Sequence, residues 1–273
     1  MPTLSVPDCE LHYEVIDLTP PWLAAPETIL FHHGLGATSG SWSGWLPALV
    51  DAFRVITFGM RGHGRSSHPQ AGAPLSFERL VGDLLAVADA VSVQRFHLVG
   101  ESIGGTVALQ AAIDHPARLR TLTISNGAHI GGSINNLGDW QQRIDGGGMV
   151  GWSEHMMHCR FFHGAIPLHM WEWYGREQAR VSSDVVLRAA RMLAGADLSG
   201  RLGGVKLPVL LMHGDSSPFI PVPVMADLKS RLADARLQVF AHARHGLPFS
   251  HARECSRMLR AFLDDMGKRS AAQ

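Results

Sequence analysis

The residue best suited to nucleophilic chemistry is Ser102, at the centre of positions 100–104, which read GESIG. This segment matches the pattern G-x-S-x-G and lies between a stretch typical of a strand and a stretch typical of a helix, opened by Gly104 and Gly105. The glycines allow a sharp turn that exposes the serine at the helix amino end, where the helix dipole and free N–H groups stabilise negative charge. A surface serine in an ordinary glycine-rich turn is the weaker interpretation. Ser102 is therefore the predicted nucleophile.

A second glycine turn, at positions 32–36, reads HHGLG and ends an earlier apolar stretch. A serine that attacks a carbonyl group needs two N–H donors to hold the oxyanion. We expect the backbone N–H groups of Ile103, directly after the serine, and of Leu35, in this turn, to supply them. The paired histidines also suggest a metal site, but neighbouring side chains on a strand point to opposite faces. One ion cannot easily bind both, so no metal is predicted here.

Strands that alternate with helices must position these two turns. Short apolar stretches between turns are typical of buried parallel strands, and longer stretches with apolar residues on one face are typical of helices. The predicted strands cover residues 3–6, 11–16, 28–33, 54–58, 96–100, 119–125, 209–212 and 237–240, and the predicted helices cover residues 41–50, 76–91, 103–113, 224–232 and 252–266. The alternation predicts the fold class α/β, with a mostly parallel central sheet and helices on both faces.

The strand pattern disappears between residues 131 and 202. Helical periodicity dominates there, interrupted by glycines at 146–148 and by Pro167. We predict a helical cap at 131–202, inserted between a first part of the α/β core at 1–130 and a second part at 203–273. We expect the cap to lie over one edge of the sheet, where loops commonly carry function.

These motifs resemble those of the α/β-hydrolase superfamily. The similarity rests on the turn HHGLG, the segment RGHGRS at 61–66 after a predicted strand, and the elbow GESIG, in that order along the chain. It covers essentially the whole chain and implies the α/β-hydrolase fold, with a catalytic triad in the order serine, acid, histidine. The resemblance places the histidine at His245, after the last predicted strand. There it would accept the proton of Ser102 and return it to the leaving group.

The acid departs from the pattern of the superfamily. Its members usually read G-x-x-D-P after the penultimate strand, whereas positions 214–218 here read GDSSP, with Ser217 at the acid position. Three alternatives follow: Asp215 orients His245, Ser217 does so through a neutral hydrogen bond, or the chain has no conventional triad. We choose Asp215 as the expected acid. A second departure is Gly59, where relatives usually carry a structural aspartate.

Within the superfamily, the closest similarity is to the 3-oxoadipate enol-lactonases. This resemblance implies that Arg143 or Arg160 binds a substrate carboxylate, because a guanidinium group forms a planar bidentate contact. A solvated position on the cap surface is the alternative for each arginine. Trp152, with Trp171 and Trp173, is expected to pack the cap on the sheet, and the alternative is that some of them, Trp152 first, line an apolar substrate pocket. The similar segments are NGAHIG at 126–131, WQQRI at 140–144 and RFF at 160–162.

Three further cap residues have a spacing that permits a metal site. His155, Cys159 and His163 are each four residues apart and would share one face of a helix, with ligands that suit zinc. A polar or aromatic-packed helix face is the more common origin of such spacing. We therefore predict no metal and no organic cofactor.

The composition bounds the partners and the location. The 273 residues include 24 basic and 24 acidic side chains without a basic run, which argues against nucleic acid or an anionic membrane surface as partner. We expect no signal peptide and no membrane span. Three distant cysteines suggest no disulfide framework. The expected location is the cytoplasm and the expected partner is a small-molecule substrate, while the oligomeric state is not predicted.

Together these features predict a serine hydrolase that cleaves a small ester or lactone through an acyl-enzyme intermediate. Two alternatives stay open because of the serine at position 217. The same fold could serve C–C bond cleavage, lyase or other non-ester chemistry without a standard Ser-His-Asp triad, or the chain could be a non-catalytic ligand binder. The elbow, the oxyanion turn and His245 argue against the binder, since a receptor has little need of all three.

Overall fold

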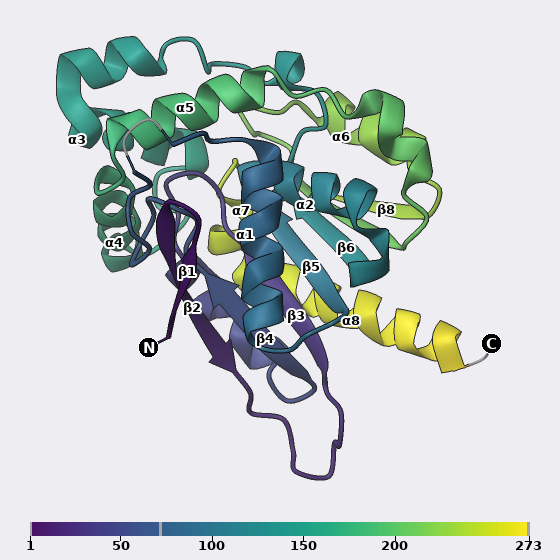
Figure 1. The fold of residues 1–273 in the computed structure, drawn as a ribbon. Coiled ribbons are helices and arrows are strands. Elements are labelled where there is room, and N and C mark those ends of the chain that lie inside the picture. Colours follow the sequence, from purple (N-terminus) through teal and green to yellow (C-terminus); the bar gives the residue numbers. More distant parts are fainter. Residues whose placement is uncertain (1, 71–72, 272–273) are drawn as a thin grey trace.

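A mostly parallel sheet forms the centre of the computed structural model, which describes residues 2–70 and 73–271. Across these residues eight strands pair in the order β1-β2-β4-β3-β5-β6-β7-β8 (Figure 1). Within this described part of the chain the pairs β1–β2 and β2–β4 are antiparallel, and the other five pairs are parallel. The strands are β1 (Thr3–Val6), β2 (Cys9–Ile16), β3 (Glu27–His32), β4 (Phe53–Phe58), β5 (Phe96–Glu101), β6 (Leu119–Ser125), β7 (Val209–Gly214) and β8 (Ala235–Phe240).

Helices cover both faces of this sheet. Along β3, Leu30 packs into one apolar cluster while Ile29 and Phe31 pack into another, because successive side chains of a strand point to opposite faces. The first cluster includes α1 (Phe77–Ala90), α2 (Ile103–Asp114) and α6 (Val222–Arg231), and the second includes the 3-10 helix η1 (Ser39–Ala48) and α8 (Ala252–Ala271). The predicted α/β architecture is confirmed.

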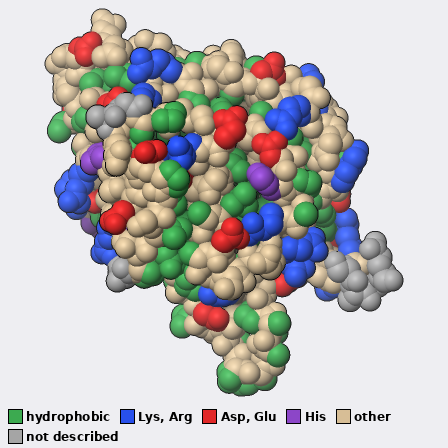
Figure 2. Space-filling model, viewed as in Figure 1, with side chains coloured by type: hydrophobic (Ala, Val, Ile, Leu, Met, Phe, Trp, Pro, Cys, Tyr) green, Lys and Arg blue, Asp and Glu red, His purple; other side chains and the backbone are tan. Residues whose placement is uncertain are grey.

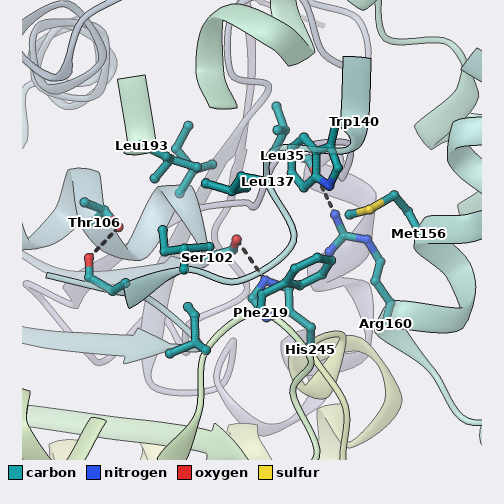
Figure 3. A pocket seen from close by; sticks show the side chains of 14 residues that line it. Leu35, Ser102, Thr106, Leu137, Trp140, Met156, Arg160, Leu193, Phe219 and His245 are labelled. Atoms are coloured by element: carbon teal, nitrogen blue, oxygen red, sulfur yellow. Dashed lines mark hydrogen bonds between the residues drawn. The ribbon is translucent and has the colours of Figure 1, made fainter. Parts of the chain in front are cut away.

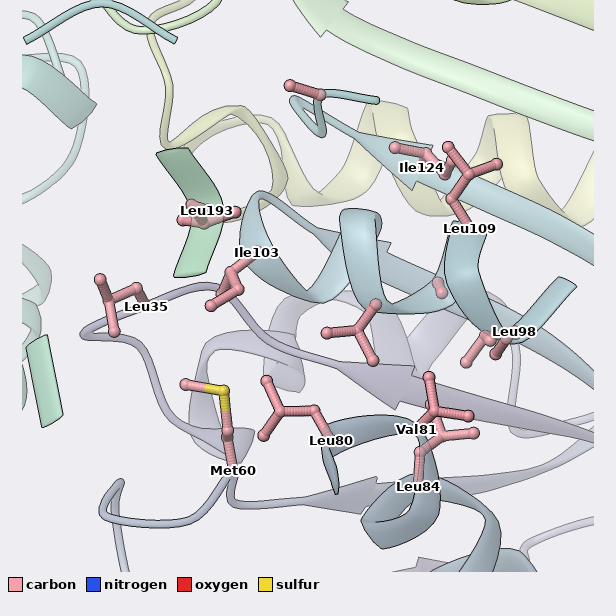
Figure 4. Packing of buried hydrophobic residues seen from close by; sticks show 14 of the residues in the cluster. Leu35, Met60, Leu80, Val81, Leu84, Leu98, Ile103, Leu109, Ile124 and Leu193 are labelled. Atoms are coloured by element: carbon pink, nitrogen blue, oxygen red, sulfur yellow. The ribbon is translucent and has the colours of Figure 1, made fainter. Parts of the chain in front are cut away.

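The first cluster continues to the position of the predicted site. Figure 4 shows Leu35 and Ile103 packed beside Met60, Leu80 and Leu193, the last of these from α5 (Ser183–Ala194). All five side chains are nearly excluded from solvent. The two residues expected to hold the oxyanion are therefore packed among buried apolar side chains.

The segment between β6 and β7 consists of helices gathered at one end of the sheet (Figure 1). They are α3 (Trp140–Arg160), α4 (Leu168–Ala179) and α5 (Ser183–Ala194), with short 3-10 turns at Gly131–Ser133 and Ser199–Gly204. Gly148 has a φ of 62° and breaks α3 into two parts that point in different directions. No helix in the described ranges is both long enough and apolar enough to cross a bilayer. The limits set at residues 131 and 202 stay a prediction.

The loop between β2 and β3 projects from the opposite end of the molecule (Figures 1 and 2). It exposes Leu18, Trp22 and Leu23, of which Trp22 is 85% exposed. This loop lies far from the pocket described below and takes no part in the site.

A buried ion pair fixes the loop that reads RGHGRS. Arg61 is fully buried and donates from Nε to Asp83 Oδ2 at 2.7 Å and from Nη2 to Asp83 Oδ1 at 2.6 Å. In the same loop Gly59 leaves room for a close turn, since an added Cβ would lie 2.8 Å from the carbonyl oxygen of His63 and from Ser66 Oγ. The glycine departure is thus compatible with tight local packing.

Replacing Asp83 by alanine is expected to lower the free energy of unfolding by about 3–5 kcal/mol, because the Arg61 charge would stay buried without its partner. The matched control is Asp139→Ala, which removes an exposed partner of Arg143 and should cost less than about 1 kcal/mol. Urea denaturation of the two variants measures the difference. Equal losses would show that the Arg61 pair is not buried in solution.

Candidate active site

Ser102 occupies a strained turn between β5 and α2. Its backbone has φ 53° and ψ −121°, in a region that residues other than glycine rarely adopt. The turn closes only because its flanking residues lack side chains: a Cβ on Gly100 would lie 2.3 Å from the carbonyl oxygen of Gly104. The glycines of the motif are therefore required by sterics, and they hold Ser102 at the amino end of α2.

His245 lies against this serine, on the loop between β8 and α7 (Leu247–Ser250). Its Nε2 is 3.0 Å from Ser102 Oγ (Figure 3). Burial, the charge of Arg160 and neighbouring His213 lower the pKa of His245 well below its usual value near 6.5. The imidazole is therefore neutral at pH 7 and able to accept the serine proton.

The residue on the other side of His245 is Ser217, which corrects the choice of Asp215. Ser217 Oγ lies 3.0 Å from His245 Nδ1 and also accepts a hydrogen bond from the N–H of Ile220 at 3.3 Å. A hydroxyl group can hold the ring in the productive tautomer, with a proton on Nδ1, but it carries no charge to stabilise the imidazolium ion.

Both carboxylate oxygens of Asp215 are engaged elsewhere on the surface. Oδ1 accepts hydrogen bonds from Ser216 Oγ at 2.8 Å and from the N–H of Ala243 at 3.3 Å, and Oδ2 accepts one from the N–H of His242 at 3.1 Å. The hydrogen bond from Ser216 is the main cause that lowers the pKa of this carboxyl group. Asp215 thus ties the loop after β7 to the loop after β8 and leaves Nδ1 of His245 to Ser217.

Asn126, directly after β6, supports the loop that carries His245. Its Nδ2 donates to the carbonyl oxygen of His245 at 2.8 Å, and its Oδ1 accepts from the N–H of Gly214 at 3.1 Å. With φ 49°, its backbone is in the left-handed region that asparagine tolerates better than most residues. This bridge across three loops was not predicted from the sequence. The one sequence signal for it is an asparagine, a residue that tolerates positive φ, directly after a predicted strand.

The turn after β3 is held by His33. Its Nε2 accepts from the N–H of Met60 at 2.9 Å, and its Nδ1 lies 2.8 Å from the carbonyl oxygen of Gly34. Burial lowers the pKa of His33 well below its usual value and keeps the ring neutral, so that Nε2 can accept from Met60 while Nδ1 donates to Gly34. Leu35 and Ile103 line the pocket together with Ser102. That their N–H groups hold an oxyanion stays a prediction.

The pocket around Ser102 and His245 is mostly apolar. The empty space between its walls is about 410 Å³, a figure that includes its opening to solvent. The hydroxyl group of Thr106 donates to the carbonyl oxygen of Ala128. Arg160 is the charged side chain in the wall of the pocket. The lining residues are Leu35, Ser102, Ile103, Thr106, Ala128, Ile134, Leu137, Trp140, Met156, Arg160, Leu193, Phe219, Ile220 and His245 (Figure 3).

Of the three residues expected to contact the substrate, the pocket contains Arg160. Arg143 is half-exposed and donates to Asp139 at 2.8 Å. It lies before the break at Gly148, in the other part of α3 from Arg160. Trp152 is fully buried behind Trp140, with ring centroids 5.5 Å apart. The expectations for Arg143 and Trp152 as pocket residues are therefore wrong, and Trp140 takes the place given to Trp152.

Of the three equally spaced residues His155, Cys159 and His163, the first two form a pair. His155 Nε2 lies 3.4 Å from Cys159 Sγ. Within the described residues, no group of three His, Cys, Asp or Glu side chains could hold a metal ion. Burial raises the pKa of the Cys159 thiol, so this cysteine is a poor thiolate ligand as well.

Comparisons with known proteins agree with this architecture. A family model of the alpha/beta hydrolase fold matches residues 27–149. A protein of Caulobacter segnis named as a carbamate hydrolase, RutD, is 26% identical over 269 residues, which cover 89% of this chain and 93% of that protein. The 3-oxoadipate enol-lactonase 1 of Acinetobacter baylyi is 27% identical over 195 residues, which cover 70% of this chain and 71% of that protein.

Solved structures extend the agreement to the whole fold. The enol-lactonase from Burkholderia xenovorans LB400 superposes with a TM-score of 0.85 at 23% identity, over 96% of this chain and 100% of that one. The order of strands and the strained serine between β5 and α2 fit the same family. The chain therefore has the α/β-hydrolase fold, and its relatives include enol-lactonases.

Proposed function

We propose that the chain is a serine hydrolase that cleaves small esters or lactones through an acyl-enzyme intermediate. The observation that carries the proposal is the 3.0 Å contact between Ser102 Oγ and Nε2 of the buried, neutral His245, at the wall of an apolar pocket. A nucleophile and a base within hydrogen-bond reach, with a third group on the far side of the base, form the arrangement of an activated serine. The proposal requires no metal or organic cofactor.

The reaction would proceed in two steps. Ser102 Oγ attacks the carbonyl carbon while His245 Nε2 takes the serine proton, and the N–H groups of Leu35 and Ile103 stabilise the oxyanion. The bond to the leaving oxygen then breaks, and His245 returns the proton to that oxygen. Water attacks the acyl-enzyme in the second step, again with His245 as the base, and releases the carboxylic acid and free Ser102.

The pocket supports a compact substrate with one polar group. Its walls are apolar, and Arg160 is the charged side chain among them, with its Nη1 held 3.7 Å from Glu101 Oε1. The names of the similar proteins refer to an enol-lactone and to a carbamate. Both are acyl compounds whose carbonyl carbon a serine can attack.

The neutral side chain of Ser217 favours a second candidate. Without a carboxylate beside His245, the chain could carry out C–C bond cleavage or a lyase reaction that needs no complete triad. A ligand binder without turnover is the remaining alternative. The state of Ser102 distinguishes these candidates from the hydrolase, because only an activated serine reacts rapidly with an electrophilic phosphorus reagent.

Labelling with a fluorophosphonate tests the proposal. We expect one adduct per chain, which peptide mass spectrometry assigns to Ser102, and no adduct on heat-denatured protein. Rates with p-nitrophenyl acetate, a γ-lactone and a phenyl carbamate then establish which acyl compound is cleaved fastest. If a control serine hydrolase is labelled under the same conditions and Ser102 is not, the hydrolase proposal is wrong and the second candidate is favoured.

A further inference from the structure

A buried ion pair lies directly behind the oxyanion turn. Glu101, the residue before the nucleophile, and Arg160, at the end of α3, approach to 3.7 Å, and their side chains are 4% and 2% exposed. Two charges in such a position cost considerable free energy unless hydrogen bonds compensate them. The groups that provide this compensation indicate what the pair does.

The hydrogen bonds of the pair reach the main chain of the oxyanion turn. Glu101 Oε2 accepts from the N–H of Gly34 at 3.3 Å, and Arg160 Nη2 donates to the carbonyl oxygen of Leu35. The peptide groups on both sides of the expected oxyanion donor, the N–H of Leu35, are thus held by one carboxylate and one guanidinium. The two side chains hold the flanking peptide groups, while the carbonyl oxygen of the peptide that carries this N–H lies 2.8 Å from His33 Nδ1.

Arg160 also connects this turn to the cap and to the histidine loop. Its Nε donates to Oε1 of the fully buried Gln178 at 2.7 Å, and Gln178 Nε2 donates to the carbonyl oxygen of Ser153 at 3.0 Å. The carbonyl oxygen of Arg160 accepts from the N–H of Gly246, the residue after His245, at 2.9 Å. One cap residue therefore contacts the oxyanion turn, the elbow residue Glu101 and the histidine loop.

We propose that Arg160 and Glu101 are positioning residues, through which the cap holds the Leu35 turn in the geometry of an oxyanion hole. This inference rests on the proposed function and deepens it. Loss of the pair should lower the stabilisation of the tetrahedral intermediate rather than the affinity for the substrate, because the displaced group acts when the oxyanion forms. Glu101 lies outside the lining of the pocket, so its effect is separable from substrate contact.

The test uses the double variant Glu101→Gln/Arg160→Met, which removes both charges together and avoids an unpaired buried charge. With p-nitrophenyl acetate, and with active sites titrated by fluorophosphonate, we expect kcat to fall about 100-fold and KM to change less than about 3-fold. The inhibition constant of phenylboronic acid, a mimic of the tetrahedral intermediate, should rise in step with the loss in kcat. Glu101→Gln alone should lose less than Glu101→Ala, since glutamine can still accept from Gly34.

Arg176→Met is the matched control. This arginine lies on the exposed side of α4, 3.9 Å from Glu172, and its replacement should leave all three constants unchanged. A purely structural role for the buried pair would reduce thermal stability or the number of titrated sites, with kcat per site retained, and would overturn the inference. A rise in KM alone would assign Arg160 to substrate contact only and would also overturn it. If the wild-type protein neither reacts with fluorophosphonate nor cleaves an ester, the proposed function itself fails, and the positioning role falls with it.

Discussion

Replacing Ser102 by alanine is expected to lower kcat by about 10⁶-fold, because the pocket would retain no nucleophile and only water could attack the substrate. The fold should be unaffected. Alanine meets the same strain as serine at φ 53°, and in the described part of the chain the serine hydroxyl hydrogen-bonds only to His245. Initial rates with the best substrate of the ester and lactone panel measure the loss, and thermal unfolding checks that the variant is folded.

His245→Gln provides the second arm of this experiment. Since serine and base act in one step, the double variant Ser102→Ala/His245→Gln should be no slower than either single variant. Two results would contradict the assignment: losses that multiply in the double variant, or a Ser102→Ala protein that keeps more than about 1% of wild-type kcat. Either would mean that the turnover arises at another group.

The sharp turn at Ser102 could be predicted because its steric requirements restrict which residues can flank it. A strand that turns sharply into a helix needs residues without side chains at Gly100 and Gly104, and the structure shows that a Cβ at Gly100 would overlap the next turn. The strands were predictable for a related reason: a strand buried on both faces, such as β7, must be apolar at most of its positions. His245 followed from chain order in the family that these motifs resemble.

Side-chain directions on irregular backbone could not be predicted in this way. Asp215 and Ser217 lie on one loop, and only the folded loop shows that Ser217 points toward His245 while Asp215 binds the N–H groups of the next loop. Arg143 and Arg160 lie on one helical stretch, but its break separates an exposed arginine from a buried one. Sequence spacing defines a helix face only while the helix stays regular.

Buried polar residues were the hardest to predict from the sequence. Glu101 occupies the variable position of G-x-S-x-G, where the pattern requires nothing, so the sequence gives no reason to expect an ion pair. Burial raises the pKa of this carboxyl group, and the Arg160 charge opposes that rise. The partner is distant in the sequence and belongs to the cap, so only tertiary structure brings the two together.

Replacing Ser217 by aspartate is expected to increase kcat/KM by at least about 10²-fold, since loss of the acid in a serine–histidine–aspartate triad costs about 10⁴-fold. An aspartate in this half-buried position would accept the Nδ1 proton of His245 and stabilise the imidazolium ion that forms as Ser102 attacks. The N–H of Ile220, which now donates to Ser217, would satisfy a second carboxylate lone pair. The gain should appear in kcat rather than in KM, because the charge acts only when the imidazolium forms.

The pH dependence provides an independent readout of the same substitution. In the wild-type protein the pKa of His245 lies well below 6.5, so kcat/KM should stay constant on acidification until pH falls well below that value. A carboxylate beside Nδ1 favours the protonated ring and raises this pKa, so the acid limb of the Ser217→Asp profile should move to higher pH. The control is Ser217→Asn, because asparagine has nearly the same shape as aspartate without its charge. It should change kcat/KM and the pH of the acid limb much less than Ser217→Asp does.

An aspartate variant with the rate and pH profile of the wild type would show that position 217 does not face His245. A shifted limb without a faster rate would show instead that imidazolium stabilisation does not limit turnover.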